Sequence, residues 1–511
     1  MKKTIALMLA LILAAVAFAA CSGGENGGGN GASTAERSEP AANSGTETVS
    51  QAESAEESAE EPSVDPYYDG LPEMNYGGRE FRILQRVEFK YEFETDETVP
   101  EKVNQLVAER NRNVEDRFGV KIVTVDQKGA WGNHEDFMNY IRNSMLLDDP
   151  GYDLIAGYAA IMPSAVGDDL FRNWYDLDEW INFEKPWWSQ DIVNELTING
   201  RLYLLTGDIS MTFWDMMTGM FFNKDIAKNY EGKTDSFNKS LYDLVRDHEW
   251  TFDTMLQICK EVYVPTDDED ARIYSYCTQR TTQIDVYQDA FGINVTEKDS
   301  DGRPFFSINT TYGEKIADTL GKMFDLVVNQ PFTYVIPADK SAYEEFFGLG
   351  RALFEPLSLG DGIKLKNYDI DYGILPMPMY NTDQDDYYTT CKDNYSVFAV
   401  PATVSDSELE FIGIITEALC VESSKTVIPQ YYNIVLKERN TTDADSVEMI
   451  DIVRQGVRCN FGYLYSYAME WPAHQLNVCV NNQIENFGTN WQSKENMFES
   501  NLEDVIDYYF N

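Results

Sequence analysis

The chain has 511 residues, and 43% of them are hydrophobic, a share typical of globular proteins. Its formal net charge of −46 at pH 7 argues against the basic surface that binding to nucleic acid, or directly to anionic lipid, requires. Residues 67–511, the part expected to fold, are too many for one hydrophobic core and predict two or three domains.

The first 20 residues have the pattern of a secretory signal peptide. Two lysines follow the initial Met, and residues 4–20 carry no charge and are mostly small or aliphatic. This run is too short for a comfortable transmembrane span. The segment 18–21, Phe-Ala-Ala-Cys, resembles the lipobox at which bacterial lipoproteins are cleaved and lipidated, here on Cys21. Ordinary cleavage after Ala19, with Cys21 incidental, is the open alternative.

Residues 21–66 have the composition of a tether. Positions 22–66 are mostly Gly, Ser, Ala, Glu, Asn and Thr, with ten acidic residues, one basic residue and almost no large apolar side chain. Such a segment cannot bury enough apolar surface to fold. A diacylglycerol and an N-acyl chain on Cys21 would anchor it firmly. We therefore expect a lipid-anchored protein on the outer face of the bacterial cytoplasmic membrane, in the extracellular or periplasmic space.

Strand and helix patterns alternate after the tether. Short apolar runs predict strands at 79–85, 120–125 and 152–157. Apolar residues at helical spacing predict a helix from Pro100 to Gly119, and a further helix is expected near 134–147. This alternation is typical of a parallel sheet covered by helices, so the fold class is α/β.

The second part of the chain mixes strands, loops and helices. Six apolar runs predict strands, at 220–225, 272–278, 304–308, 352–356, 371–378 and 395–400. Helical spacing covers 241–263 and 313–328, and the rest of 264–311 is expected to be loop. The spacing of Ser405 and Glu408 fits a capping box and predicts a helix start. The C-terminal hundred residues are expected to be mainly helical.

Cysteine and histidine give little indication of chemistry. Six cysteines follow Cys21, which permits three disulfides in an exported protein, and buried free thiols are the equally open alternative. The three histidines are widely spaced, which does not suggest a zinc site. The motifs of serine hydrolases, zinc proteases and phosphate loops are missing from the sequence. We expect no cofactor, no metal and no catalysis.

Several stretches resemble, in this order, the extracellular solute-binding proteins of bacterial ABC importers, in the sugar-binding branch that includes the maltodextrin receptors. They are YDLIAGYAAIMPSAV (152–166), NGRLYLLTGDIS (199–210), EWTFDTMLQICKEV (249–262), ALFEPLSLGD (352–361), DYGILPMPMY (371–380) and EALCVESSKTVIPQYYNIVLK (417–437). Each stretch alone is weak, whereas the ordered set is fairly specific. The resemblance covers nearly all of 78–511.

The resemblance implies a two-lobed periplasmic-binding-protein-like fold with a ligand cleft between the lobes and a three-segment hinge. The chain would cross between the lobes near 206, 394 and 440. The N-terminal lobe would then comprise 67–206 and 395–440, and the C-terminal lobe 207–394 and 441–511. Binding would close the lobes by hinge motion.

The function implied is that of a monomeric lipoprotein that captures a small solute, with a carbohydrate as the leading candidate, and delivers it to the permease subunits of an ABC importer. Two alternatives stay open. One is a cell-surface glycoside hydrolase or lyase, and the other is a surface adhesion or sensor-partner lipoprotein.

A sugar cleft needs flat aromatic rings for the apolar faces of the sugar and carboxylates or amides for its hydroxyl groups. Six residues match this requirement at positions where the family presents ligand contacts: Tyr158, Asp208, Trp214, Asp215, Glu355 and Trp471. The pair Trp187 and Trp188 could also stack on a sugar, but a Pro-Trp-Trp sequence that opens a helix more often anchors the helix to the core.

Overall fold

The structure, a computed structural model, describes residues 65–147, 149–268, 272–340, 342–431 and 444–510. The chain divides into two units, Met1–Ser63 and Val64–Asn511, and the features below belong to the second. The expected signal peptide, the lipidation site Cys21, the tether up to residue 64 and the crossing expected near 440 lie outside the described residues. Within the described ranges, no helix has the length and apolar character that a membrane crossing requires.

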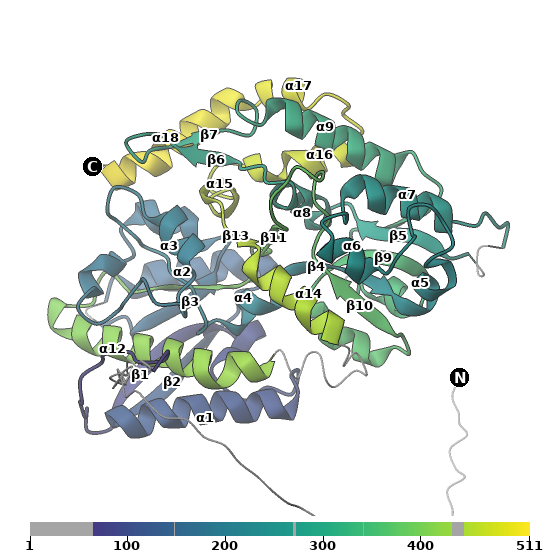
Figure 1. The fold of residues 1–511 in the computed structure, drawn as a ribbon. Helices are drawn as coiled ribbons and strands as arrows, with labels where there is room; N and C mark the ends of the chain where they lie inside the picture. The colour runs from purple at the N-terminus through teal and green to yellow at the C-terminus, as the bar shows by residue number, and fades with distance from the viewer. Residues whose placement is uncertain (1–64, 148, 269–271, 341, 432–443, 511) are drawn as a thin grey trace, which may run out of the picture. The chain divides into compact units, whose positions relative to one another are not determined.

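The first sheet has four strands in the order β12-β3-β1-β2, of which β1, β2 and β3 are labelled in Figure 1. Strands β1 (Arg79–Arg86), β2 (Val120–Gln127) and β3 (Leu154–Tyr158) run parallel, and β12 (Ser396–Ala399) is antiparallel to β3. The strands expected near these positions are confirmed. We call this sheet, with the helices that cover it, the first lobe.

Among the helices of the first lobe, α1, α2 and the start of α12 lie where the sequence predicts helices, and the others were not predicted individually. The helices of this lobe are η1 (Val87–Glu92), α1 (Glu101–Phe118), η2 (Trp131–Asn133), α2 (His134–Ser144), η3 (Met162–Asp168), η4 (Trp174–Leu177), α3 (Gln190–Leu196), α12 (Asp406–Glu422) and η7 (Ser423–Val427). Helix α1 ends at Gly119, whose φ of 61° suits glycine. Helices α1 and α12 lie side by side (Figure 1).

One predicted detail of α12 is wrong. The Ser405 side chain does not cap the helix and contacts the Ser407 hydroxyl instead, while the Glu408 carboxylate pairs with Arg79. Arg79 also lies over the Phe411 ring of α12. Both contacts fasten α12 to the start of β1, where Arg79 lies. The capping-box spacing therefore marks the helix start correctly but not the contacts made there.

The second sheet has five strands in the order β10-β4-β9-β5-β8. They are β4 (Thr218–Asn223), β5 (Tyr274–Gln279), β8 (Thr333–Ile336), β9 (Ala352–Ser358) and β10 (Tyr372–Leu375). Strands β8, β5 and β9 are parallel to one another, and β4 runs antiparallel to β9 and β10. We call this sheet and its helices the second lobe.

The second lobe is covered by short helices. They are α4 (Met211–Asp215), α5 (Lys224–Tyr230), α6 (Leu241–Arg246), α7 (Phe252–Val262), α8 (Thr282–Ala290), α9 (Gly313–Met323), η5 (Phe324–Val328), α10 (Glu345–Gly348), α11 (Asp361–Lys364), η6 (Leu365–Asn367) and α14 (Ala444–Gln455).

Two expectations for this lobe are corrected. The helical run at 241–263 is broken between α6 and α7, because His248 adopts a φ of 56° and the Thr251 hydroxyl caps α7 at the Thr254 amide. The stretch 264–311, expected to be loop between short strands, contains α8. Every residue of α8 from Gln283 to Ala290 is buried, so the helix shows no apolar stripe against a polar face.

The remaining elements are two short strand pairs and the helices that follow α14. These are the hairpin of β6 (Thr296–Lys298) and β7 (Pro304–Phe306), the pair β11 (Thr389–Thr390) and β13 (Val457–Arg458), and the helices α15 (Phe461–Leu464), η8 (Pro472–His474), α16 (Gln475–Asn481), α17 (Phe487–Gln492) and α18 (Glu495–Phe510).

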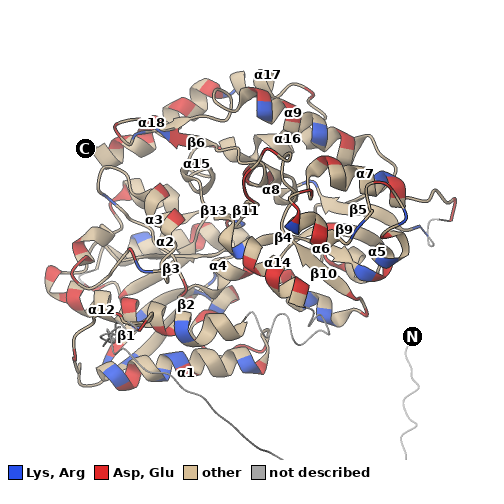
Figure 2. Cartoon of the chain, in the orientation of Figure 1, with Lys and Arg blue, Asp and Glu red and all other residues tan. Residues whose placement is uncertain are grey.

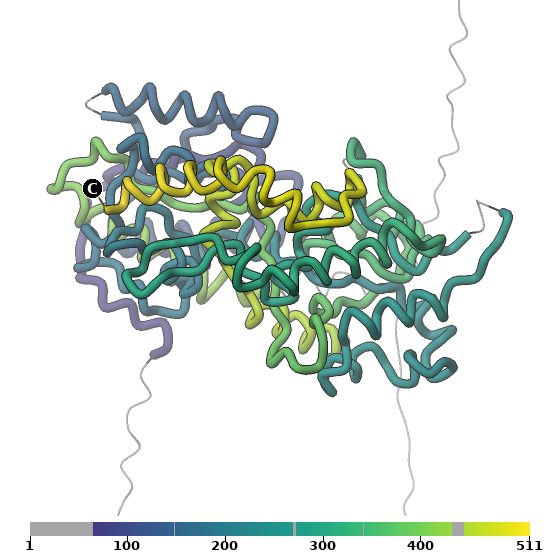
Figure 3. Tube along the Cα trace, turned by 90° about the horizontal axis from the view of Figure 1, so that it is seen from above, coloured from purple at the N-terminus to yellow at the C-terminus, as the bar shows by residue number. Residues whose placement is uncertain are grey.

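Helix α18 contacts residues that are distant in sequence. Phe498 packs on Phe306 of the hairpin, and at the other end of the helix the Tyr508 and Tyr509 carbonyl oxygens accept hydrogen bonds from Arg201 and Asn199. Figure 3 shows the yellow C-terminal trace extending from the side of the first lobe toward that of the second. The C-terminal helix therefore connects the hairpin to the loop at 199–201.

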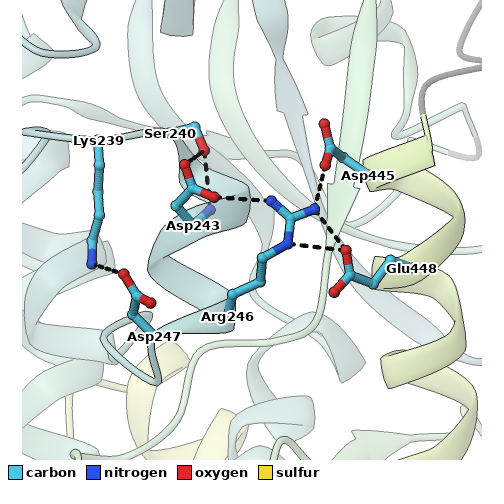
Figure 4. Close-up of polar contacts among 7 residues, drawn as sticks. All are labelled: Lys239, Ser240, Asp243, Arg246, Asp247, Asp445 and Glu448. Atoms are coloured by element: carbon cyan, nitrogen blue, oxygen red, sulfur yellow. Dashed lines mark hydrogen bonds and ion pairs between the residues drawn. The ribbon is translucent and has the colours of Figure 1, made fainter.

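The chain passes between the sheets at least twice within the described residues. Residues 206–217, the first crossing, lead to β4, and residues 391–395, the second crossing, join β11 to β12. A third connection leads from η7 to α14, partly through 432–443. Where it arrives, Arg246 of α6 forms ion pairs with Asp445 and Glu448 of α14 (Figure 4). These pairs fasten α14 to α6.

Neither the acidic residues nor the cysteines are concentrated in one part of the described structure. Asp and Glu occur on helices of both lobes (Figure 2), so the acidity belongs to the surface as a whole. All six cysteines between Cys259 and Cys479 are free thiols, and five of them are buried.

A buried carboxyl group holds the tryptophan pair at the first crossing. The indole nitrogens of Trp187 and Trp188 donate to the two oxygens of Glu417 on α12, at 3.0 and 2.7 Å. The Asp208 amide donates to the Trp187 carbonyl oxygen at 2.8 Å, so the chain at Gly207 lies directly against the pair. The pair anchors the core, as its sequence suggests.

We expect Gly207→Ala to destabilise the fold. A methyl group at this position would overlap the Trp187 carbonyl oxygen and press on Trp188, and neither can move without disturbing the Glu417 bonds. The free energy of unfolding should fall by about 1–3 kcal/mol or more, measured by chemical denaturation.

The control is Gly132→Ala, where a methyl group would meet open space and should leave stability nearly unchanged. Equal stability of the two variants would show that the contact at Gly207 is not tight.

Candidate functional site

A cavity of about 540 Å³ is lined by residues that follow the carboxyl ends of parallel strands in both lobes. In open α/β sheets, ligands bind outside these strand ends. Phe89 and Tyr91 follow β1, and Tyr158 ends β3. The second lobe contributes Thr281 and Thr282 after β5, Tyr343 after β8, and Gly360 and Asp361 after β9.

Both described crossings also line this cavity. Asp215 and Met216 come from the first crossing, and Lys392, Asp393 and Asn394 come from the second. Another hollow of about 540 Å³, which includes Tyr274 and Tyr334, is lined by the second lobe alone. The cavity at the crossings is lined by both lobes and by both described crossings, so its shape depends on the angle between the lobes, and we take it as the candidate ligand cleft.

One buried carboxylate joins the crossings. Glu92, at the end of η1, accepts hydrogen bonds from Ser210 and Thr212 of the first crossing, with distances of 2.9–3.1 Å for the Ser210 hydroxyl and the Thr212 amide and hydroxyl. Its other oxygen accepts the Ser396 hydroxyl, at the end of the second crossing, at 2.5 Å. The Ser396 amide in turn donates to the Thr212 hydroxyl oxygen at 2.8 Å.

Two buried arginines extend this network. Arg110 of α1 donates to the Glu92 carbonyl oxygen at 2.7 Å and to the Ser423 hydroxyl of η7 at 3.3 Å, where the third connection begins. Arg86 donates to the Asn394 side chain at 3.1 Å, and its guanidinium lies 4.9 Å from the centre of the Tyr158 ring. The floor of the cleft is thus bound to the first lobe.

Asp215 is a cleft carboxyl group that is held by tyrosines. The Tyr91 hydroxyl donates to one carboxylate oxygen at 2.6 Å, and the Tyr431 hydroxyl donates to the other. Burial raises the pKa of Asp215 to about 7, although the Tyr91 hydrogen bond acts in the opposite direction. The residue links the first crossing to η1 and to the segment after η7.

An aromatic cluster continues from the cleft at Tyr158. The Trp131 ring, whose residue is 50% exposed, lies 6.4 Å from Tyr158, 6.2 Å from Tyr467 and 5.7 Å from Trp471 between ring centroids. Trp471 has a φ of 71°, a left-handed conformation that is uncommon for an aromatic residue. Trp131 is exposed and the other three rings are partly buried, and such rings suit the apolar face of a sugar.

On the second lobe, the Asp361 carboxyl group is fully engaged. It accepts hydrogen bonds from the Tyr343 hydroxyl at 2.8 Å, the Ser358 amide at 3.1 Å and the Lys364 ammonium at 2.8 Å. Although burial opposes it, the charges of Lys364 and Lys392 and these bonds lower the pKa of Asp361. The carboxylate positions the wall of the cleft.

The structure brings three of the six predicted site residues to the cleft or its aromatic extension: Tyr158, Asp215 and Trp471. Asp208 is buried at the first crossing, where it accepts the indole N–H of Trp214 at 3.1 Å. The Trp214 ring lies under the Arg454 guanidinium, 4.6 Å from the ring centroid. As ligand contacts, all of these residues stay predictions.

Glu355 lies within β9 and is completely buried. It accepts hydrogen bonds from the Cys277 thiol at 3.2 Å and the Gln283 amide at 3.4 Å, and burial raises its pKa well above the usual range. In this position it supports the second sheet below the cleft surface, and its role as a ligand contact stays a prediction.

The sequence analysis did not single out Trp131, Tyr91 or Lys392. Trp131 and Tyr91 had an available signal, because each follows a predicted parallel strand and so belongs at the carboxyl edge of the sheet. Lys392 had none, because only the course of the second crossing places it in the cleft. Among the residues whose positions are described, no group of three His, Cys, Asp or Glu could hold a metal ion.

No protein-family model matches the chain, and no curated protein matches it by sequence. Its structure resembles an ABC substrate-binding protein from Listeria monocytogenes, Lmo0181, in complex with cycloalternan, with a TM-score of 0.52, 11% identity, and 84% of this chain and 98% of that chain covered. It also resembles a cyclo/maltodextrin-binding protein complexed with maltotetraose, with a TM-score of 0.50, 13% identity and coverage of 84% and 96%.

The chain has the two-lobed fold of these solute-binding proteins. The resemblance expected from the ordered sequence stretches is thereby confirmed for the fold. Both neighbours match over 84% of this chain at low sequence identity.

We expect Asp208→Asn to reduce the dependence of stability on pH. Burial raises the pKa of Asp208 to about 7, whereas an aspartate in the unfolded chain titrates near 4. Between these values the folded state binds more protons than the unfolded state, so the free energy of unfolding falls as pH rises from about 4 to about 7. Asparagine keeps an oxygen for Trp214 but does not titrate, so the difference in Tm between pH 5 and pH 8 should shrink.

Asp301→Asn, at an exposed turn, is the control and should leave that difference as in the wild type. If Asp208→Asn also kept the full wild-type difference, the buried carboxyl group would not titrate as described.

Proposed function

We propose that the protein is a solute-binding receptor that captures a carbohydrate in the cleft at the crossings and delivers it to an ABC importer. The observation that carries this proposal is the combination, in one cavity, of aromatic rings, carboxyl groups and both described crossings. The rings offer apolar faces, the polar groups offer partners for hydroxyl groups, and the crossings allow closure around the bound solute.

The solved neighbours favour a saccharide over other solutes. One was solved with cycloalternan and the other with maltotetraose, and both have the same two-lobed fold. The aromatic cluster of Trp131, Tyr158, Tyr467 and Trp471 extends beyond the cavity, which suits an oligosaccharide of several units. We therefore place oligosaccharides ahead of monosaccharides.

Anchoring belongs to the same proposal. A lipid on Cys21 and the tether 21–66 would hold the receptor at the outer face of the cytoplasmic membrane, close to the permease subunits. A tethered receptor reaches its transporter at a high effective concentration. Metabolic labelling with a clickable fatty acid, compared between the wild type and Cys21→Ala, tests the anchor, which the variant should lose.

A glycosidase is the second candidate, and one observation favours it. Asp215 and Asp361 line the same cavity, with the pKa of Asp215 raised and that of Asp361 lowered, as in a general acid and base. Against this, tyrosines occupy both oxygens of Asp215, and three protein groups engage Asp361. We therefore expect no turnover. Release of reducing ends from a bound oligosaccharide would place the glycosidase function ahead of the receptor function.

We expect thermal unfolding in the presence of mono- and oligosaccharides to identify a selective ligand. A ligand at 100 times its Kd adds about 2.7 kcal/mol of stability, which raises Tm by several degrees. In Tyr158→Ala and Trp471→Ala, the Kd for that ligand should rise about tenfold, because each variant removes a stacking surface.

The control is Tyr68→Ala, which removes an exposed ring outside the cleft and should bind as the wild type does. A flat response to all saccharides, with a shift for peptides or amino acids, would contradict the proposal.

A further inference from the structure

Lys392 is a buried lysine whose charge faces the cleft. It lies in the second crossing, where its amide donates to the Met216 carbonyl oxygen at 3.0 Å. The residue is 9% exposed and lines the cavity. Its ammonium makes no hydrogen bond or ion pair with any residue that the structure describes, and it lies over the Tyr343 ring, 5.5 Å from the nitrogen to the ring centroid.

Three acids, Asp361, Glu355 and Asp393, act on the charge of Lys392, and the first two are engaged by other partners. Asp361 accepts hydrogen bonds from Tyr343, Ser358 and Lys364, and Glu355 accepts from Cys277 and Gln283 below the cleft surface. Burial lowers the pKa of Lys392, although Asp361 and Glu355 act against this effect. A buried ammonium without a direct partner is costly, and a ligand group that accepts hydrogen bonds would offset the cost.

The N-terminus of α8 opens on the same cavity. Helix α8 has nine residues, its N-cap Thr281 makes no side-chain capping bond, and Thr281, Thr282 and Gln283 line the cavity. The first amide groups of a helix have no partner within it, and the helix dipole adds partial positive charge there. Lys392 and the start of α8 thus present positive charge to one space, which is the arrangement that binds anions.

Other residues in the lining of the cleft have a different character. Asp393, the next residue after Lys392, lies near His474 and Tyr158 and raises the pKa of the Tyr158 hydroxyl group along with burial. Tyr158 leads into the aromatic cluster. A carboxylate beside rings suits an uncharged sugar ring with hydroxyl groups. Lys392 and Asp393 therefore bring a basic and an acidic group to the lining of the same cavity.

We propose that the ligand is an acidic saccharide, whose carboxylate binds between the Lys392 ammonium and the N-terminus of α8 while its sugar rings occupy the Tyr158 side. This inference rests on the proposed function. A singly charged carboxylate fits better than a phosphate, because Asp215, Asp361 and Asp393 line the same cavity and repel a double charge. The acidic outer surface does not prevent this binding, since salt screens charges beyond about 8 Å.

The test is a calorimetric titration of the full chain with matched ligands. Oligosaccharides of galacturonate, glucuronate and mannuronate are each compared with their methyl esters, which keep the sugar and remove the charge, and with sulfated and neutral oligosaccharides. We expect one uronate to bind at least tenfold tighter than its ester. Lys392→Met should weaken the uronate at least tenfold and leave the ester within twofold, and Lys392→Arg should restore part of the loss.

Lys366→Met is the matched control, because it removes the same charge from an exposed position of the second lobe. It should bind both ligands as the wild type does, and the Tm of each variant reports folding. Three results would overturn the inference while saccharide binding stands. They are an ester that binds as tightly as its acid, tighter binding of a sulfated oligosaccharide, and a Lys392→Met variant that binds the uronate with the wild-type Kd. No binding of any saccharide would instead overturn the proposed function, and this inference with it.

Discussion

The Glu92 carboxylate is the contact on which the relation between the two lobes depends. It sits in the first lobe, yet its four hydrogen bonds go to Ser210 and Thr212 in one crossing and to Ser396 at the end of the other. Arg110 donates both to the Glu92 carbonyl oxygen and to the Ser423 hydroxyl, and so links Glu92 to the start of the third connection. Removing one partner from a buried charged network is costly, so these hydrogen bonds hold both described crossings to the first lobe.

This attachment explains why the cleft lies where it does. The crossings are held at the carboxyl edge of the first sheet. The carboxyl edge of the second sheet therefore lies at the same cavity. Residues after β1, β3, β5, β8 and β9 then line this one cavity. Polar groups that hold the crossings, such as Asp215, and groups free to contact a ligand, such as Lys392, consequently lie side by side in one wall.

Sequence patterns predicted the fold better than the site. Short apolar runs predicted the parallel strands. Tyr158 was predicted as a site residue because it lies at the end of one of these strands. Helix α8 was not predicted because nearly all of its residues are buried. Its sequence therefore lacks the apolar stripe that indicates a helix at the surface of a sheet. Asp208 and Glu355 are polar residues of the expected type, but in the structure they serve the crossings and the second sheet. Residue type alone cannot separate these roles, because the same carboxylate can hold a backbone or a sugar.

The most direct test of the central claim is a crystal structure grown with the saccharide that raises Tm most. The account predicts that the sugar lies in the cleft at the crossings, touching Tyr158 from the first lobe and residues after β5 or β9 from the second. A saccharide bound instead in the hollow beside Tyr274 and Tyr334, on the second lobe alone, would contradict it.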